Sequence, residues 1–403
     1  MSGKRFTSGF VIAAAIGLAA CAPAAGTTAT ATSQPPIAQP CAWPTQLSVQ
    51  TANRGAPDSG ATYWLQPIVA GAGTRIVLDG DYPDARYISL ATYTPDGSAF
   101  DGSSIADYRI APEPGSVNPW QRAARPGGRF RVTIGSGQGN TIAMPPGTTV
   151  EHPGYLLYRV YLPASPVPLP AITVEQGLTA RELPACRDHD APPPKPIRTT
   201  TPTTTPGSTP TPPQLAFYKP GGTFDNGLPN VDTAYVLAYL VRPAASDVVV
   251  VRAKAPAAAP GNHPTPWPAA GEDMRYWSMC VVQGTGMIPT VVNTLPGGQT
   301  DYGCRADDAT ARDATGDYTY VIGAESQRAA IERVPNVTFL PFATDQTSRL
   351  YLLLLRNTLV SKGFPNSTQN VTQTDDPAAA SAAMGPYYPQ ASVCPLATLA
   401  ACL

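Results

Sequence analysis

A phrase that occurs twice limits the folds open to this 403-residue chain. Asp84-Ala-Arg86-Tyr87-Ile-Ser89-Leu90 in the first half matches Asp273-Met-Arg275-Tyr276-Trp277-Ser278-Met279 in the second half. Both copies follow a run rich in Val or Ile and precede a polar stretch rich in turn residues. A repeat that returns after about 190 residues is typical of a duplicated domain and not of a solenoid, whose repeats are much shorter.

Four further segments occur in the same order in the two halves, and their alternating or continuous apolar residues predict β-strands. They are 62–65, 75–78, 128–135 and 155–162 in the first half, and 234–240, 247–252, 317–323 and 349–356 in the second. In this alignment Arg159 corresponds to Arg356. Only 326–333 and 378–384 favour short helices. The order predicts two copies of one β-rich unit.

The composition agrees with a β-rich chain that has many loops and sheet edges. The chain has 47 prolines, and proline interrupts helices and central strands alike. Charged residues make up only 14% of the chain, against an average of roughly 25%. A net charge of −1 indicates no electrostatic attraction to nucleic acid, so we expect no nucleic-acid partner.

Changes in composition predict the domain boundaries. Residues 1–20 are expected to be a signal peptide and residues 21–40 a disordered tether rich in Ala, Thr and Pro. The first β-rich domain is then expected over 41–190 and the second over 214–403. Between them, residues 191–213 are dominated by Pro and Thr, which is typical of an extended, solvated linker.

The N-terminus predicts export. Lys4 and Arg5 precede an apolar run from Phe10 to Leu18, which is too short to span a bilayer as a mature helix. The run ends in Leu18-Ala-Ala-Cys21, which resembles a bacterial lipobox. That resemblance implies cleavage before Cys21, a diacylglyceryl thioether on its sulfur, and N-acylation with a fatty acid such as palmitate. The alternative is an ordinary secretory signal with a chance cysteine.

The resemblance also implies where the protein resides. Acyl chains on Cys21 would hold it on the lipid bilayer, outside the cytoplasm and without a transmembrane helix. No Asp follows the cysteine, where Ala22 and Pro23 stand, which favours the outer membrane if the source has one.

Six cysteines remain once Cys21 is set aside, and an even number in an exported chain predicts disulfides. Six cysteines allow 15 pairings. We predict the three pairs that keep each bridge within one proposed domain, namely Cys41–Cys186, Cys280–Cys304 and Cys394–Cys402.

The histidines give no sign of a metal site. His152, His189 and His263 stand far apart in the sequence, and no two of them have the spacing of zinc ligands on a helix or strand. No motif for a cofactor is present either, so we expect neither a metal nor a cofactor.

The second half carries a further phrase, Pro229-Asn230-Val-Asp232-Thr233-Ala-Tyr235, ahead of Arg275-Tyr276-Trp277-Ser278. This combination resembles an uncharacterised family of bacterial domains of unknown function, the twelve-fourteen type. The resemblance covers about 150 residues of the second half and extends more faintly to the first. It implies two tandem β-sandwich-like domains in a mainly β protein. In the first half, Ser59-Gly-Ala-Thr62-Tyr63 stands where the second has its Asn and Asp.

The side chains of these phrases are the candidates for ligand binding. They are Asn230, Asp232, Thr233, Tyr235, Arg275 and Trp277. Asn, Asp and Thr can also bond neighbouring backbone groups and simply set the turn that starts a strand. Arg86 and Arg275 would pair with Asp84 and Asp273, bind an anionic ligand, or brace strands.

These observations favour an extracytoplasmic lipoprotein that acts as a binding or envelope-structural module. Its partners would be the bilayer, through Cys21, and an envelope polymer or protein. One alternative is an extracytoplasmic hydrolase or other enzyme with its site around Asp232, Tyr235 and Arg275. Another is a purely structural surface protein. No catalytic residue is assigned, and the residues favour a role without catalysis.

Overall fold

The computed structural model describes residues 40–71, 73–192, 215–221, 227–284, 287–345 and 348–403. The predicted signal peptide, Cys21, the tether up to residue 39 and linker residues 193–213 lie outside these residues. The described chain is mainly β, as predicted. No described helix is long and apolar enough to cross a bilayer.

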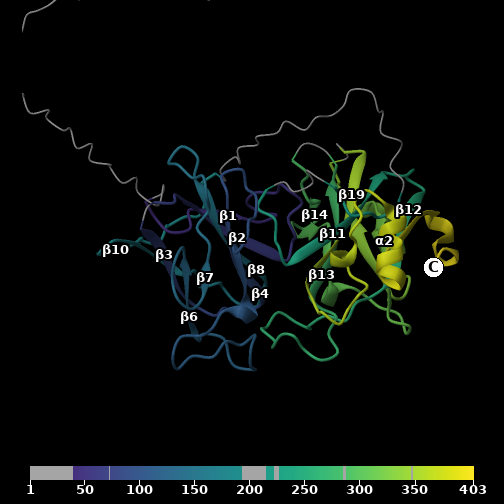
Figure 1. Ribbon diagram of the computed structural model, residues 1–403. Helices are drawn as coiled ribbons and strands as arrows, with labels where there is room; N and C mark the ends of the chain where they lie inside the picture. The colour runs from purple at the N-terminus through teal and green to yellow at the C-terminus, as the bar shows by residue number, and fades with distance from the viewer. Residues whose placement is uncertain (1–39, 72, 193–214, 222–226, 285–286, 346–347) are drawn as a thin grey trace, which may run out of the picture. The chain divides into compact units, whose positions relative to one another are not determined.

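Two five-stranded sheets, which we call the first sandwich, are built from the first half of the chain (Figure 1). Their strand orders are β1-β2-β8-β4-β5 and β10-β9-β3-β6-β7. Side chains from both sheets form one apolar core that includes Leu78, Leu90, Val132 and Val160. The strands are β1 (Thr45–Leu47), β2 (Ala61–Ile68), β3 (Thr74–Asp81), β4 (Ala85–Tyr93), β5 (Ser104–Ala106), β6 (Arg129–Ile134), β7 (Thr141–Ile142), β8 (Gly154–Pro163), β9 (Ala171–Gln176) and β10 (Thr179–Glu182).

Two four-stranded sheets from the second half form what we call the second sandwich. Their orders are β11-β19-β13-β16 and β18-β17-β12-β20, and a separate ribbon pairs β14 with β15. The core between the sheets includes Val249, Trp277, Tyr320 and Leu353. The strands are β11 (Thr233–Val241), β12 (Asp247–Lys254), β13 (Met274–Gln283), β14 (Val292–Thr294), β15 (Thr300–Tyr302), β16 (Cys304–Ala306), β17 (Asp317–Gly323), β18 (Val337–Pro341), β19 (Leu350–Val360) and β20 (Gln390–Pro395).

The two sandwiches share one topology, which confirms the internal duplication. Strands β2-β8-β4-β5 correspond to β11-β19-β13-β16, and β7-β6-β3-β9 correspond to β18-β17-β12-β20. The pairs β6–β7 and β17–β18 are both parallel. The correspondence extends to single residues, since Leu162 and Leu359 adopt the same left-handed backbone (φ 46° and 48°) at the ends of β8 and β19.

The predicted strands and both predicted helices are present. Helix α2 (Pro377–Met384) begins after Asp376, whose side chain accepts hydrogen bonds from the amides of Ala378 and Ala379. Helix α1 (Arg328–Ile331) continues a 3₁₀ turn at Glu325–Gln327.

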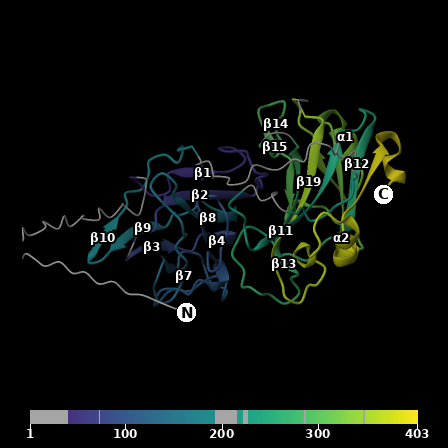
Figure 2. The same ribbon diagram turned by 45° about the horizontal axis from the view of Figure 1, so that its top comes forward.

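The structure also contains strands that the sequence analysis did not anticipate. Strand β10 is exposed at all four residues and is paired only with β9 in a hairpin (Figure 2). Strand β20 has only one fully buried residue, Cys394, and pairs with β12. Such strands carry no clear apolar period, because pairing and not burial holds them in place.

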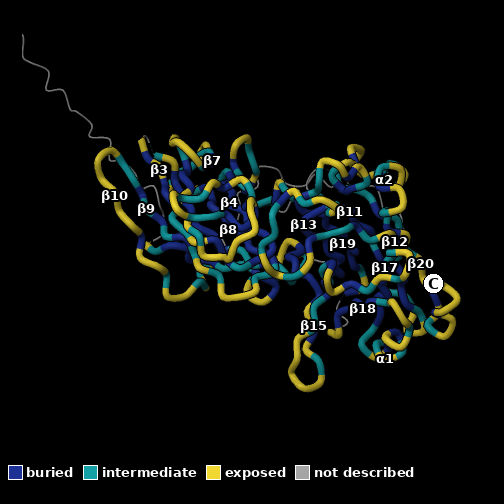
Figure 3. The backbone as a smooth tube through the Cα atoms, turned by 90° about the horizontal axis from the view of Figure 1, so that it is seen from below, coloured by how far each residue is buried: buried dark blue, intermediate teal, exposed yellow. Residues whose placement is uncertain are grey.

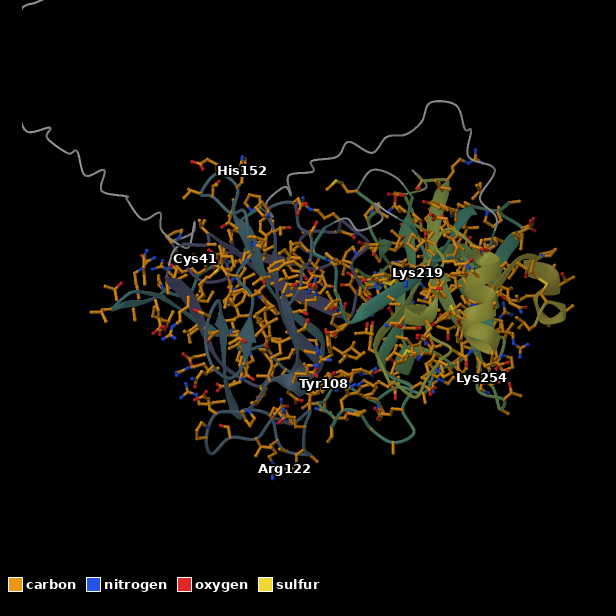
Figure 4. The ribbon with its side chains drawn as sticks, viewed as in Figure 1. Cys41, Tyr108, Arg122, His152, Lys219 and Lys254 are labelled. Atoms are coloured by element: carbon orange, nitrogen blue, oxygen red, sulfur yellow. A yellow bond between two sulfur atoms is a disulfide. The ribbon has the colours of Figure 1, made fainter. Side chains whose placement is uncertain are left out.

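The three predicted disulfides are confirmed. Cys41 (labelled in Figure 4) bonds to Cys186 and so joins the two ends of the first sandwich. Cys280 and Cys304 link the neighbouring strands β13 and β16. The remaining bridge ties β20 to the end of the chain through Cys394 and Cys402.

The central strands are buried on both of their faces, as the dark blue segments of Figure 3 show. All nine residues of β4 are buried, and so are the first nine of the ten residues of β13. One face of β4 packs into the first core through residues such as Ile88 and Leu90. On its other face, Tyr93 belongs to a cluster packed against Leu228, which comes from the second half of the chain. The two halves of the chain therefore contact each other over these faces.

Candidate functional site

The repeated Arg-Tyr phrases lie where the two sandwiches contact each other. The guanidinium of Arg86 in β4 is fully buried, and its Nη1 donates to both carboxylate oxygens of Asp307 at 2.6 and 2.7 Å. Its Nη2 donates to Asp308 at 2.9 Å, and its Nε donates to the carbonyl of Gly261. The hydrogen bonds of the Arg86 guanidinium to described residues thus all go to groups from the second half.

Arg275 of β13 makes the reciprocal contact. It is also fully buried, and its Nη1 lies 3.3 Å from Asp107 Oδ2 and donates to the carbonyl of Arg86 at 2.9 Å. Its guanidinium lies 5.2 Å from the ring of Trp267, within the range of a cation–π interaction. Each copy of the phrase therefore sends its arginine to an aspartate of the other sandwich.

Asp84 and Asp273, which the sequence suggested as partners of the arginines, make other contacts. Asp84 Oδ1 accepts a hydrogen bond from His263 Nδ1 at 2.7 Å. Asp273 accepts a hydrogen bond from the backbone amide of Ala257 at 2.8 Å. Both carboxylates thus serve to position segment 257–263.

Asp107 and Asp307 occupy equivalent places. Each begins a short 3₁₀ helix, Asp107–Arg109 or Asp307–Ala309, directly after an alanine that ends a strand. The carboxylate of Asp107 accepts from the amide of Ile88, and that of Asp307 accepts from the amide of Trp277, each at 3.1 Å. Each carboxylate is therefore positioned by its own sandwich and presented to the arginine of the other. Tyr108, next to Asp107, is labelled in Figure 4.

Burial governs the titration of these carboxyl groups. It raises the pKa of Asp107 from 3.8 to about 6, and the guanidinium of Arg275 offsets this only in part. Burial likewise raises the pKa of Asp307 against the opposing effect of Arg86. The cause is the loss of hydration, which disfavours the charged form of a carboxyl group.

A second reciprocal pair of contacts involves the turns that lead into β2 and β11. These turns are Gly55-Ala56-Pro57-Asp58 and Gly227-Leu228-Pro229-Asn230, and Ala56 and Leu228 share the left-handed backbone (φ 54° and 59°). Arg356 donates to the carbonyl of Ala56, and Arg159 donates to that of Leu228. Here too each sandwich supplies an arginine to the other.

These turns correct the alignment made from the sequence, which placed Ser59 onward opposite the Asn and Asp of the second half. Tyr63 is registered with Arg159 as Tyr235 is with Arg356. Counting back from the two tyrosines, Asp58 corresponds to Asn230 and Gly60 to Asp232. The backbone agrees, because the carbonyls of Gly60 and Asp232 accept from the equivalent amides of Leu162 and Leu359.

Asp58 is the more fully bonded of the two. Its Oδ2 accepts from Ser278 Oγ at 2.6 Å and from the hydroxyl of Tyr276 at 2.8 Å, and lies 3.3 Å from Arg356 Nη1.

In the equivalent contact around Asn230, the hydroxyl of Tyr87 lies 3.3 Å from Asn230 Oδ1 and 2.8 Å from Asp232 Oδ2. The equivalent tyrosines therefore meet a single carboxylate on one side, and an amide with a second carboxylate on the other.

The structure brings only part of the predicted ligand-binding set together. Asn230 and Asp232 share the hydroxyl of Tyr87, while Thr233 Oγ1 lies 2.9 Å from Thr358 Oγ1. The ring of Tyr235 lies under Arg356, with its centroid 5.7 Å from the guanidinium carbon.

The other two members of the set are enclosed. Arg275 is bound to the first sandwich, and Trp277 lies inside the second core, where its Nε1 donates to the carbonyl of Pro256. The arrangement can hold two sandwiches together, but the burial of Arg275 and Trp277 leaves neither side chain accessible to a dissolved ligand.

Three aspartates that organise the contact were missed from the sequence, namely Asp58, Asp107 and Asp307. A signal was present for each. An Ala-Asp pair follows each Arg-Tyr phrase, at 106–107 and 306–307, and a Gly-x-Pro-Asp or Gly-x-Pro-Asn turn precedes each first strand of the repeat. These motifs are only two to four residues long. They indicate a role because they occur at equivalent places in the two sandwiches.

One cluster has the residue types of a metal site. Asp58, Cys280 and Cys304 lie within 4.8 Å of one another. The two cysteines are bonded to each other, so neither offers a thiolate. The cluster is therefore a disulfide beside a bonded carboxylate.

Fold and site together define a protein of two β-sandwiches that are related by duplication and joined by reciprocal contacts of buried arginines. No family model and no curated protein matches the chain. An uncharacterised protein from Burkholderia cenocepacia, known from a crystal structure, is similar in fold with a TM-score of 0.51 and 14% identity. The match covers 90% of this chain and 84% of that one.

Two proteins described as containing an anti-sigma factor domain, one of them from Clostridium clariflavum, match with TM-scores of only 0.17 and 0.20. Their identities are 7% and 8%, and the matches cover 88% and 74% of this chain and 86% and 76% of theirs. Likeness at that level carries no argument about this chain.

Proposed function

We propose that the protein is an extracytoplasmic lipoprotein, anchored to a bacterial membrane through acylated Cys21, that acts as a binding or envelope-structural module. The Leu-Ala-Ala-Cys21 ending of an export-type N-terminus supports the anchor. Three disulfides support an oxidising compartment, because thiols stay reduced in most cytosolic proteins. An outer-membrane position, where the source has one, remains part of this proposal.

The observation that carries the structural side of the proposal is the use of the repeated residues. Arg86, Arg275, Arg159 and Arg356 all bond groups of the opposite sandwich, and each is at most 3% exposed. Four buried guanidinium groups committed in this way favour a pair of sandwiches that acts as one rigid block. Such a block suits a module that holds a binding surface away from the membrane.

The alternative of an enzyme site around Asp232, Tyr235 and Arg275 gains no support from this geometry. A group that acts on a substrate must reach it, whereas Arg275 is fully buried and bonded to Asp107 and Arg86. An envelope polymer or protein as partner fits the proposal better, because such partners bind the outer surface of a rigid module.

The lipid anchor is tested by a substitution that removes the sulfur atom expected to carry the lipid. Cys21→Ala should abolish labelling by an alkyne analogue of palmitate and release the protein from a membrane pellet that retains the wild type. Globomycin, which blocks cleavage of lipoprotein signals, should leave the uncleaved wild-type precursor. Ala24→Ser, three residues away, is the matched control and should label as the wild type does. Continued labelling of the Cys21→Ala protein would refute the anchor.

A further inference from the structure

The two reciprocal turn contacts share their arginine, serine and tyrosine but differ in the turn residues that these side chains meet, above all Asp58 against Asn230. Ser89 is registered with Arg159 across β4 and β8, and Ser278 is registered with Arg356 across β13 and β19. Side chains directly opposite in neighbouring strands lie on the same face of the sheet. Each pair therefore presents a hydroxyl and a guanidinium side by side to the turn of the other sandwich. That turn carries Asp58 in one case and Asn230 in the other.

With Asp58, the donors are satisfied. One carboxylate oxygen accepts from Ser278 and Tyr276 and lies at ion-pair distance from Arg356 Nη1. The positive charge of Arg356 thus meets a negative charge in a place where both side chains are nearly excluded from water, at 3% and 1% exposure.

In the contact around Asn230, the equivalent serine and arginine donors have no described carboxylate to bond. Arg159 Nη1, Ser89 Oγ and Asn230 Nδ2 are buried and make no hydrogen bond of normal geometry with the described residues. The hydroxyls of Tyr87 and Tyr93 lie near Ser89 and Arg159, but they donate to Asp232 and to the carbonyl of Pro229. Asn230 Oδ1 already accepts from the amide of Asp232, which orients the NH₂ group away from that amide. A buried donor left without a partner is costly, and a buried charge without a counter-charge is more so.

Asp232 is the carboxylate nearest in sequence to Asn230, and it does not take the place of Asp58. Its Oδ2 accepts from the hydroxyl of Tyr87, and no described carboxylate forms an ion pair with Arg159 as Asp58 does with Arg356. Burial raises the pKa of Asp232, and the hydrogen bond from Tyr87 and the charge of Arg159 oppose that rise. Arg159 therefore has two tyrosine rings, those of Tyr63 and Tyr93, and a carboxylate at longer range in place of the direct ion pair that Arg356 forms.

We propose that Arg159, Ser89 and Asn230 bind a small monovalent anion, with chloride as the physiological ion, at the position that the Asp58 carboxylate occupies on the other side. The three donors suit a spherical anion, which accepts hydrogen bonds from any direction. Their exposures of 2%, 1% and 6% mean that a bound ion would be almost entirely excluded from bulk water, which favours a small ion. The ion would complete the contact between the sandwiches, and the site is independent of lipid anchoring.

Thermal unfolding of the purified protein in sodium chloride and in sodium gluconate at matched ionic strength tests the site, because gluconate is too large to enter. Over a hundredfold range of chloride, the midpoint of the wild type should rise by about 3–5 °C more than in gluconate. Asn230→Asp supplies the missing carboxylate and should remove this difference. Equal midpoints of the wild type in the two salts would overturn the proposal.

Two serine variants separate the site from general salt effects. Ser89→Ala removes one donor and should raise the chloride concentration needed for half of the effect about tenfold. Ser278→Ala, the matched control in the other contact, should leave that concentration unchanged. Crystals grown in bromide should show an anomalous peak between Arg159 Nη1 and Ser89 Oγ. The absence of an anomalous peak at this position would refute the halide.

Discussion

Replacing Arg86 with alanine should lower the free energy of unfolding by about 3–5 kcal/mol at neutral pH. The substitution leaves the carboxylate of Asp307 buried, at 3% exposure, without the two hydrogen bonds that Arg86 Nη1 donates. It also strands the carbonyl of Gly261 and releases Asp308. Urea denaturation followed by fluorescence and circular dichroism measures the change.

Two further variants show whether the effect arises from the buried charge. Arg131→Ala removes an arginine of similar pairing, 2.7 Å from Asp79, but with 53% of its side chain exposed; it should cost no more than about 1 kcal/mol. Arg86→Met combined with Asp307→Leu removes both buried charges and should recover most of the loss, because the remaining unpaired carboxylate, Asp308, is 33% exposed and stays hydrated. A cost for Arg86→Ala as small as that for Arg131→Ala would show that the contact contributes little to stability.

The contribution of Asp107 to stability should decrease as the pH rises from 4 to 7. Its pKa in the folded chain is about 6, against an ordinary value of 3.8. In this window the folded state binds a proton that the unfolded state has lost, so the stabilisation is fully present below about pH 4 and is lost as the pH passes 6. At about 1.4 kcal/mol for each pH unit, the difference amounts to about 3 kcal/mol.

Asp107→Asn isolates this group from the other carboxyls. Asparagine has nearly the same shape, can still accept from the amide of Ile88, and does not titrate. The difference in unfolding free energy between wild type and variant should therefore change by about 3 kcal/mol across the window, in the direction that favours the wild type at low pH. A difference that stays constant from pH 4 to 7 would mean that Arg275 holds Asp107 ionised throughout.

Both experiments concern the same feature, the reciprocal contact between duplicated sandwiches. The phrase that the sequence singled out as a possible site is committed to this contact through Arg86, Tyr87, Arg275 and Tyr276. A ligand of the proposed module is therefore to be sought on the outer surfaces of the sandwiches.

The sequence allowed most strands to be predicted because their side chains alternate or are continuously apolar. Segment 129–134 was expected as a strand and is β6 (Arg129–Ile134), and the Arg-Tyr phrases lie in β4 and β13. The cysteine pairs were predictable for a similar reason, since each bridge closes within one repeat. Strands β10 and β20 were missed because they bury few side chains and depend on one neighbouring strand.

The sequence by itself determined that the chain is β-rich, duplicated and cross-linked within each copy, because periodicity, repetition and cysteine number are properties of the chain read in order. Only the tertiary structure decided which carboxylates the arginines bind. Arg86 and Asp307 are 221 residues apart, and Arg275 and Asp107 are 168 apart. A buried charge pairs with whatever charge the opposing surface brings to it, and that depends on how two folded surfaces meet. The same holds for Asn230, whose unequal match with Asp58 appears only when the two contacts are superposed.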